Sequence, residues 1–150
     1  MNIKVERYKN NGRVVDGLLK INGETICSTA ENAEHCLVEG VYDVELHHCK
    51  QYGRRVLLVN TTDESIQLSK DEECELCHEL GFVCQNTDLP SYCPMIKMGN
   101  GAYNRTDGSI LVGEYVANGC LIHPKKHYKA IFDRVRKALK RGKRVKMKIC

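Results

Sequence analysis

The residues best placed to do chemistry lie in a glycine-rich segment, residues 97–113 of the 150-residue chain. Its glycine, asparagine and aspartate residues predict a long loop of tight turns that leads into a short apolar strand at residues 110–112. Ser109 would stand at the start of that strand, beside a cleft. A serine hydroxyl is a nucleophile only when a base accepts its proton, and the loop contains no histidine. Ser109 is therefore either a nucleophile whose base comes from elsewhere in the fold or a small residue that begins a buried strand.

Two segments around this loop resemble a domain family of unknown function that occurs in phages, prophages and mobile elements of gut bacteria. The first is Met95-Ile96-Lys97-Met98-Gly99-Asn100, where the family has Ile-x-Ile-His-x-Gly-Asn. The second is Thr106-Asp107-Gly108-Ser109-Ile110-Leu111-Val112-Gly113, where the family has Asp-Thr-x-Gly-Cys-Ile-Leu-Val-Gly. Looser matches extend over Gly12–Ile21, Val38–Val44 and Lys129–Lys140. The family's pattern is similar in turn to the His-Gly…Gly-Cys signature of L,D-transpeptidases, in which a cysteine thiolate attacks a peptide carbonyl.

Both catalytic positions of that signature are changed in this chain. Met98 stands where the histidine would be, and Ser109 stands where the cysteine would be. The resemblance therefore implies a degenerate L,D-transpeptidase-like β scaffold without the transpeptidase activity. We expect a non-catalytic accessory or ligand-binding protein of a phage or mobile element, whose loop holds a small anionic ligand, a nucleotide such as a host defence signal, or a peptidoglycan fragment. The ligand-binding residues would be Asn100, Asn104, Arg105, Asp107 and Ser109.

A second function class, an enzyme that modifies cell-wall peptides, would need another nucleophile. Cys120 and His123 lie three residues apart after a turn at residues 118–119, and a cysteine paired with a histidine is a common thiolate nucleophile. Residues three apart in an extended strand face opposite sides of the sheet, so a direct pair requires a bend. The enzyme alternative therefore depends either on Cys120 with His123 or on Ser109.

A polar, cysteine-rich segment at residues 71–93 looks inserted between strands. Four cysteines could hold a structural zinc ion there in tetrahedral geometry: Cys74, Cys77, Cys84 and Cys93. Only the first two form a Cys-x-x-Cys pair, and the surrounding acids disfavour the thiolate forms that bind metal. Disulfides and simple packing of free cysteines are the alternatives. A segment stapled by disulfides would suit a third function class, a structural component of a virion or mobile-element particle that forms homo-oligomers.

Positive charge is concentrated near the C-terminus. Residues 125–148 contain twelve Lys or Arg and one acid, Asp133, whereas the formal net charge of the whole chain is +4. The outward-facing basic residues would be Lys129, Arg136, Lys137, Lys140, Arg141, Lys143 and Arg144. Such a face either attracts phosphate groups or is a solvated surface that balances the acidic residues of 63–79. The chain has no nucleic-acid-binding motif and no Trp, so we expect no sequence-specific binding of nucleic acid.

A strand-rich fold must position these groups. Alternating apolar residues predict strands at 2–8, 14–21, 24–28, 40–49, 55–60, 65–68 and 143–149, with turn signals at 10–12 and 22–23. Apolar residues at helical spacing predict one amphipathic helix, Lys125–Lys140. We therefore expect a single α+β domain, residues 1–150, with a mostly antiparallel β-sheet or partly open barrel, the C-terminal helix, and the cysteine-rich insertion at 71–93.

The chain carries no predicted targeting or membrane segment. No apolar run approaches the length of a membrane helix, and Met1–Arg7 follows a strand pattern rather than that of a signal peptide. We therefore expect the protein in the host-cell cytoplasm or in a virion, with no membrane partner. Nine cysteines, an odd number, leave at least one thiol unpaired in a monomer, and reduced thiols are the default in the cytoplasm.

Overall fold

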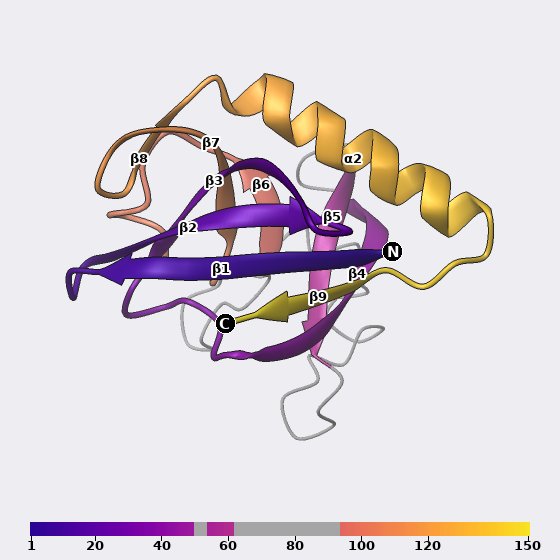
Figure 1. The fold of residues 1–150 in the computed structure, drawn as a ribbon, viewed down its shortest axis with the longest axis horizontal. Helices are drawn as coiled ribbons and strands as arrows, with labels where there is room; N and C mark the ends of the chain where they lie inside the picture. Colours follow the sequence, from indigo (N-terminus) through magenta and orange to yellow (C-terminus); the bar gives the residue numbers. More distant parts are fainter. Residues whose placement is uncertain (50–53, 62–93) are drawn as a thin grey trace.

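The computed structural model describes residues 1–49, 54–61 and 94–150 (Figure 1). Within these ranges the strands that precede the helix are β1 (Asn2–Asn10), β2 (Val14–Ile21), β3 (Glu24–Asn32), β4 (Gly40–Cys49), β5 (Arg54–Thr61), β6 (Met95–Met98), β7 (Ile110–Ala117) and β8 (Cys120–Ile122). The helix α2 (Pro124–Lys140) follows, and β9 (Lys146–Ile149) comes last. No helix in these ranges has the length and apolar character that crossing a membrane would require.

Eight of the strands close into a barrel. Hydrogen-bonded neighbours follow the order β3-β2-β1-β9-β4-β5-β6-β7, and β7 pairs with β3 to complete the circle. The short strand β8 pairs with β7 at its far end. The pairs β1–β9 and β6–β7 are parallel, and the remaining pairs are antiparallel.

The α+β class with a C-terminal helix is confirmed, but the sheet is closed rather than open and mixed rather than antiparallel. Helix α2 carries the chain back to the first strand, where β9 lies parallel to β1. The loop of residues 99–109 likewise returns the chain so that β7 runs parallel to β6. An alternating pattern marks a strand but not its partner, which is why the closure of β3 on β7 was not predicted.

Most element boundaries follow the local sequence. β2 and β4 occupy their predicted ranges, and α2 begins one residue before its predicted start. Asn22 and Gly23 both have positive φ, 48° and 88°, as a tight hairpin turn between β2 and β3 requires. β3 is longer than predicted and β9 is shorter. The predicted strand 65–68 and the cysteine-rich segment 71–93 lie outside the described residues.

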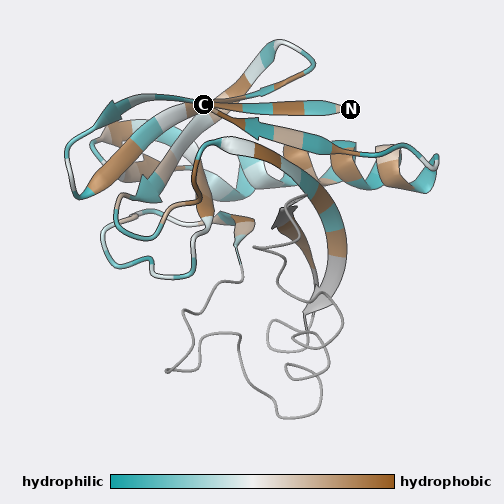
Figure 2. Cartoon of the chain, turned by 90° about the horizontal axis from the view of Figure 1, so that it is seen from below, coloured by the Kyte–Doolittle hydropathy of each residue, from teal (hydrophilic) through white to brown (hydrophobic). Residues whose placement is uncertain are grey.

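Helix α2 packs one apolar face against the barrel. Ile131, Val135 and Ala138 are buried in the same core cluster as Val5 and Leu19 of the strands. Figure 1 shows α2 lying along one side of the barrel, and Figure 2 shows hydrophobic and hydrophilic residues alternating along it. Burial of Ile131 and of Val135 contributes roughly 1.5–3 kcal/mol each, which holds the helix on the barrel and leaves its basic residues outside.

A Schellman turn ends α2. Gly142 has a φ of 71°, which glycine adopts without steric cost. The N–H of Gly142 donates to the carbonyl of Leu139 at 3.0 Å, and the N–H of Lys143 donates to the carbonyl of Ala138 at 3.1 Å. The turn reverses the chain direction and keeps Lys143 close to the last turn of the helix.

Candidate functional site

Ser109 is buried at the start of β7. It is 1% exposed, and its hydroxyl oxygen accepts a hydrogen bond from the backbone N–H of Met95 at 3.1 Å. Its own N–H donates to Oδ1 of Asp107 at 3.0 Å. In the described part of the chain no histidine hydrogen-bonds to this hydroxyl, which instead links the first residue of β6 to the residue before β7.

Asp107 forms a buried ion pair with Lys97. Lys97 Nζ lies 2.7 Å from Oδ2 of Asp107, and the two side chains are 13% and 3% exposed. Burial raises the pKa of Asp107, but hydrogen bonds from Lys97 and Ser109 outweigh burial and leave that pKa below its ordinary value of 3.8. Asp107 is therefore an ionised group that ties the glycine-rich loop to β6 and β7.

The other predicted ligand-binding residues lie in different surroundings. Asn100 is bound to β8, because its Nδ2 donates to the carbonyl of Leu121 at 3.0 Å and its carbonyl accepts the Leu121 N–H at 2.8 Å. Arg105 lines a small cavity of about 120 Å³ together with Met98, which occupies the position of the family's histidine. Asn104 is exposed. Among the five predicted residues, Asp107 and Ser109 contact each other. Arg105 lines its cavity together with Lys97 and Met95, the partners of Asp107 and Ser109.

Cys120 and His123 lie near the junction between β8 and α2. His123 adopts a left-handed conformation, with φ 51° and ψ 44°, so the chain does bend there. Its Nδ1, however, lies 2.7 Å from Oε2 of Glu114 on β7. Cys120 is half-buried, and Gly101 of the glycine-rich loop forms a β-bridge with it. Within residues 94–150 no hydrogen bond joins Cys120 to His123.

The four cysteines predicted to bind zinc lie outside the described residues. The thiols of Cys27, Cys36, Cys120 and Cys150 are free. In residues 1–49, 54–61 and 94–150, no group of three or more His, Cys, Asp or Glu side chains is arranged to hold a metal ion. Zinc binding by the insertion stays a prediction.

Cys27 is expected to resist alkylation in the native protein. It is 6% exposed, and burial raises the pKa of its thiol to about 12 against the opposing effect of a backbone hydrogen bond from Gly113. The reactive thiolate is then almost absent at neutral pH. Iodoacetamide should label Cys27 only after denaturation, as measured by peptide mass spectrometry. Native labelling of Cys27 as fast as that of the half-buried Cys120 would contradict its place in the core.

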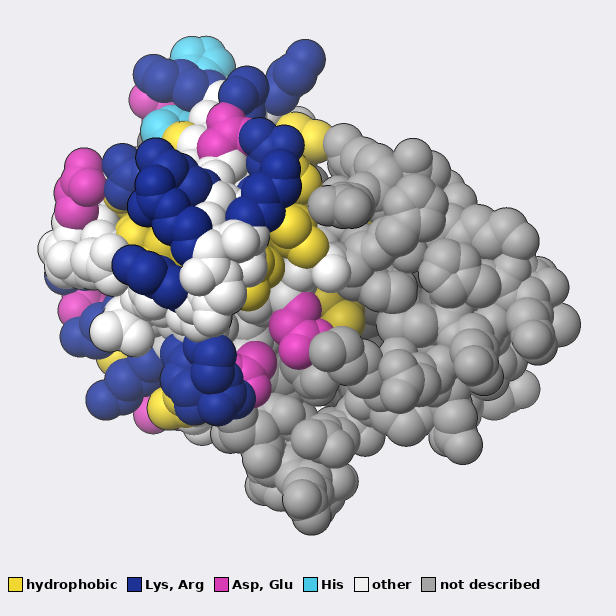
Figure 3. Space-filling view, turned by 90° about the vertical axis from the view of Figure 1, so that its right-hand side faces the viewer, with side chains coloured by type: hydrophobic (Ala, Val, Ile, Leu, Met, Phe, Trp, Pro, Cys, Tyr) yellow, Lys and Arg dark blue, Asp and Glu magenta, His cyan; other side chains and the backbone are white. Residues whose placement is uncertain are grey.

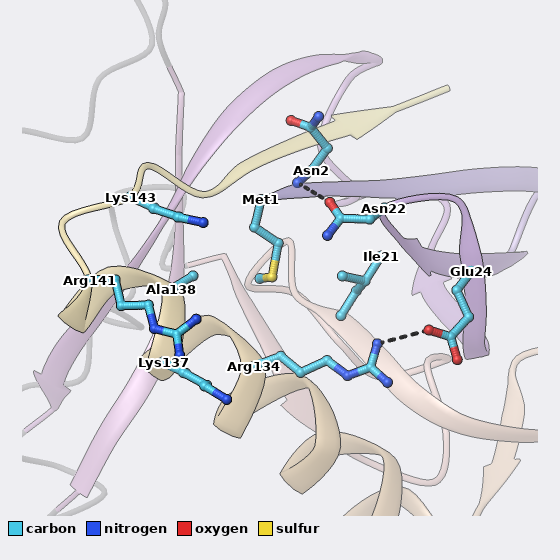
Figure 4. A pocket seen from close by; sticks show the side chains of 10 residues that line it. All are labelled: Met1, Asn2, Ile21, Asn22, Glu24, Arg134, Lys137, Ala138, Arg141 and Lys143. Atoms are coloured by element: carbon cyan, nitrogen blue, oxygen red, sulfur yellow. Dashed lines mark hydrogen bonds and ion pairs between the residues drawn. The ribbon is translucent and has the colours of Figure 1, made fainter.

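A basic pocket of about 450 Å³ lies between the end of α2 and the start of the chain (Figure 4). The helix and the turn after it contribute Arg134, Lys137, Ala138, Arg141 and Lys143. The opposite wall consists of Met1, Asn2, Ile21, Asn22 and Glu24. Backbone hydrogen bonds hold this wall in place, from Lys146 N–H to Met1 at 3.1 Å and from Asn22 N–H to Asn2 at 2.8 Å.

Four cationic side chains and one carboxylate line this pocket. Arg134 Nη1 lies 3.2 Å from Oε2 of Glu24, and both side chains are largely exposed. Within the described ranges Lys137, Arg141 and Lys143 form no ion pair. Figure 3 shows Lys and Arg side chains gathered over the side of the molecule where α2 ends. The excess of positive charge in a concave site attracts anions.

The sequence pointed to one wall of this pocket. Lys137, Arg141 and Lys143 belong to the predicted basic face, but that prediction omitted Arg134. Arg134 lies three residues before Lys137 and seven before Arg141, so the three side chains share one side of the helix. This spacing could have identified Arg134 from the sequence. The pocket shares no lining residue with the cavity at Arg105, so the basic end of α2 and the glycine-rich loop form separate sites.

Comparison of the chain with protein-family models, with curated proteins and with solved structures finds no match.

Proposed function

We propose that this protein is a non-catalytic binding protein and that it holds a small anionic ligand in the basic pocket at the end of α2. The observation that carries the proposal is the set of four cationic side chains around one cavity with a single carboxylate, Glu24. Three of these cations have no acidic partner in the described part of the chain, so an anion can bind them without first displacing a protein carboxylate.

The size and lining of the pocket suit a small organic molecule. Its volume of about 450 Å³ falls within the range of about 300–1,000 Å³ that is usual for ligand sites. Met1 and the aliphatic stems of the lining lysine and arginine side chains add apolar surface, which can cover the uncharged part of a ligand. Arginine binds phosphate or carboxylate through two parallel hydrogen bonds, and lysine adds a point charge. A phosphorylated or carboxylated organic molecule therefore fits this chemistry.

The resemblance to a family of phages and mobile elements suggests the biological setting. We place the protein among the accessory proteins of such an element, acting in the host-cell cytoplasm or carried in a virion. A protein that binds without catalysis acts by keeping its ligand from other proteins. Sequestration of a signalling nucleotide of the host is consistent with this role, and a peptidoglycan fragment, which bears carboxylates, is a second ligand of suitable chemistry.

An enzyme that modifies cell-wall peptides is the main alternative. The hydroxyl of Ser109 is engaged by the N–H of Met95, and the imidazole of His123 is engaged by Glu114. These two hydrogen bonds do not provide the contact between a nucleophile and a base on which covalent catalysis depends. Formation of an adduct on Cys120 or Ser109 with an acyl electrophile would favour the enzyme. A particle component would instead form stable homo-oligomers that carry no ligand.

Native mass spectrometry of the protein purified gently from cells tests the proposal. We expect the native mass to exceed the denatured mass by the mass of a small anion. The double variant Lys137→Ala/Arg141→Ala should lose this extra mass, because each lost charge-assisted hydrogen bond weakens binding by about tenfold or more.

The matched control is Arg136→Ala/Lys140→Ala, which removes the same charge from the same end of α2. These two exposed residues do not line the pocket. The control should keep the ligand. A bare native mass in the unmodified protein would count against the proposal, and equal ligand retention by both double variants would place the ligand elsewhere.

A further inference from the structure

Resting on the proposed function, we infer that the basic pocket selects organic molecules with two anionic groups set apart from each other, the chemistry of an organic bisphosphate such as a dinucleotide. The inference comes from the arrangement of the lining. Cations stand at both ends of the pocket, with Lys137 on the helix between them, so the positive charge extends along the whole helix side of the pocket (Figure 4).

The two ends of the pocket are separated along α2. Arg134 and Arg141 are seven residues apart on the helix, which corresponds to about 10 Å along its axis. The guanidinium of Arg134 is directed further away, because Glu24 of the β2–β3 hairpin holds it at 3.2 Å. Arg141 and Lys143 mark the opposite end in Figure 4. One phosphate therefore cannot engage both ends, whereas two anionic groups on one molecule can.

The middle of the pocket contains both polar and apolar groups. Met1 and Lys137 lie between the two cationic ends, whereas Ile21 and Ala138 are only 3% and 9% exposed and add little surface. None of the residues lining this pocket is aromatic, so the body of the ligand would lie against Met1 and the aliphatic stems of the lysine and arginine side chains.

Glu24 makes the two ends unequal. No carboxylate lines the end formed by Arg141 and Lys143, so the first anionic group binds there against no competitor. At the other end the second group must replace Glu24 as the partner of Arg134. Exposed ion pairs of this kind are weak, so the replacement costs little, but it makes Glu24 a residue that tunes specificity.

Isothermal titration calorimetry with two probes tests the inference on the full chain. Adenosine monophosphate carries one phosphate, and a linear dinucleotide with a 5′-phosphate carries two that are separated by a nucleoside. We expect the dinucleotide to bind at least about tenfold more tightly than the mononucleotide, since it gains one charge-assisted contact.

Substitutions at the two ends should act differently on the two probes. Arg134→Gln should reduce the dinucleotide affinity to that of the mononucleotide and leave the mononucleotide affinity unchanged. Arg141→Gln should weaken both probes, and Arg136→Gln, outside the pocket, should affect neither. Glu24→Gln should raise the dinucleotide affinity about two- to fivefold, the range that exposed ion pairs allow.

Several outcomes would overturn the two-ended site. Equal affinity for the two probes, or equal weakening of both by Arg134→Gln, would leave a single-anion site and the proposed function standing. Affinity that keeps rising with longer oligonucleotides would indicate a nucleic-acid surface instead. If neither probe binds, the identity of the ligand that co-purifies with the protein becomes the test. A co-purified ligand with only one anionic group would contradict the inference. Absence of both probe binding and a co-purified ligand would remove the proposed function as well.

Discussion

Replacing Glu31 with glutamine is expected to lower the free energy of unfolding by about 3–5 kcal/mol, because the change leaves a buried guanidinium without its counter-charge. Arg7 of β1 donates hydrogen bonds to both carboxylate oxygens of Glu31 on β3, from Nε at 2.9 Å and from Nη2 at 2.8 Å. Nη2 also donates to the carbonyl of Leu37 at 2.6 Å. The Glu31 side chain is fully buried and that of Arg7 is 14% exposed, so water can solvate the guanidinium only in part once the carboxylate charge is removed.

Gly17 of the intervening strand β2 has no room for a side chain. It is opposite Arg7 in the register, and a Cβ there would lie 2.7 Å from Oγ1 of Thr29 and 2.8 Å from the backbone oxygen of Glu6. The backbone of β1 and the side chain of Thr29 on β3 therefore approach β2 closely beside the charged pair. Such a pair adds less stability than its contacts suggest, but it cannot be broken at one partner without a large loss.

Urea denaturation followed by circular dichroism measures this effect. The matched control is Glu6→Gln on β1, since Glu6 also contacts two basic residues, Lys4 and Lys20, but its side chain is 32% exposed. Water screens that interaction, so the control should unfold close to the unmodified protein. The double variant Arg7→Leu/Glu31→Leu should recover most of the lost stability. Equal unfolding midpoints for the Glu31 and Glu6 variants would show that the buried pair does not hold β1 and β3 together.

Local features of the fold could be predicted from the sequence, whereas long-range pairing could not. The alternation in Val14–Ile21 and the positive-φ turn at Asn22 and Gly23 depend on neighbouring residues only, and both predictions are confirmed. The apolar stripe of α2 is local in the same sense. The contact between Ala30 of β3 and Leu111 of β7, which closes the barrel, joins residues far apart in the chain. Neither strand has a local sequence pattern that indicates the other as its pairing partner.

The same distinction applies to the candidate sites. The basic residues of α2 could be placed on one side of a helix from their spacing, but Met1 and Glu24 come to face them only when the barrel closes. In the glycine-rich loop, residue types predicted a turn-rich segment of polar side chains. Whether Asp107 would point outward or pair with Lys97 depends on the parallel contact of β6 with β7, which the sequence did not reveal.

Replacing Asp107 with asparagine is expected to cost about 2–4 kcal/mol of stability, because it removes the carboxylate charge beside the mostly buried Lys97. Asparagine keeps an oxygen that can accept the N–H of Ser109, now 3.0 Å from Oδ1. It cannot reproduce the charged contact between Lys97 Nζ and Oδ2 at 2.7 Å. The variant therefore measures how much the carboxylate charge stabilises the packing of the loop against β6 and β7.

The acid dependence of stability gives an independent measure of the same contact. The pKa of Asp107 in the folded protein lies below its ordinary value of 3.8, so the carboxylate stabilises the fold fully above that pH. The contribution is lost as the pH falls through the lower, folded-state pKa. The stability difference between the unmodified protein and Asp107→Asn should therefore be constant near neutral pH and shrink below about pH 4.

Urea titrations across this pH range measure the stability difference, with Asp133→Asn as the control. Asp133 pairs with Lys129 on the exposed face of α2, where solvent screens the charge, so its variant should differ little from the unmodified protein at any pH. A pH-independent loss in Asp107→Asn would mean that the variant disturbs packing rather than the ion pair. In that case Lys97 and Asp107 would be neighbours by geometry alone, and the glycine-rich loop would be held mainly by Ser109 and Asn100.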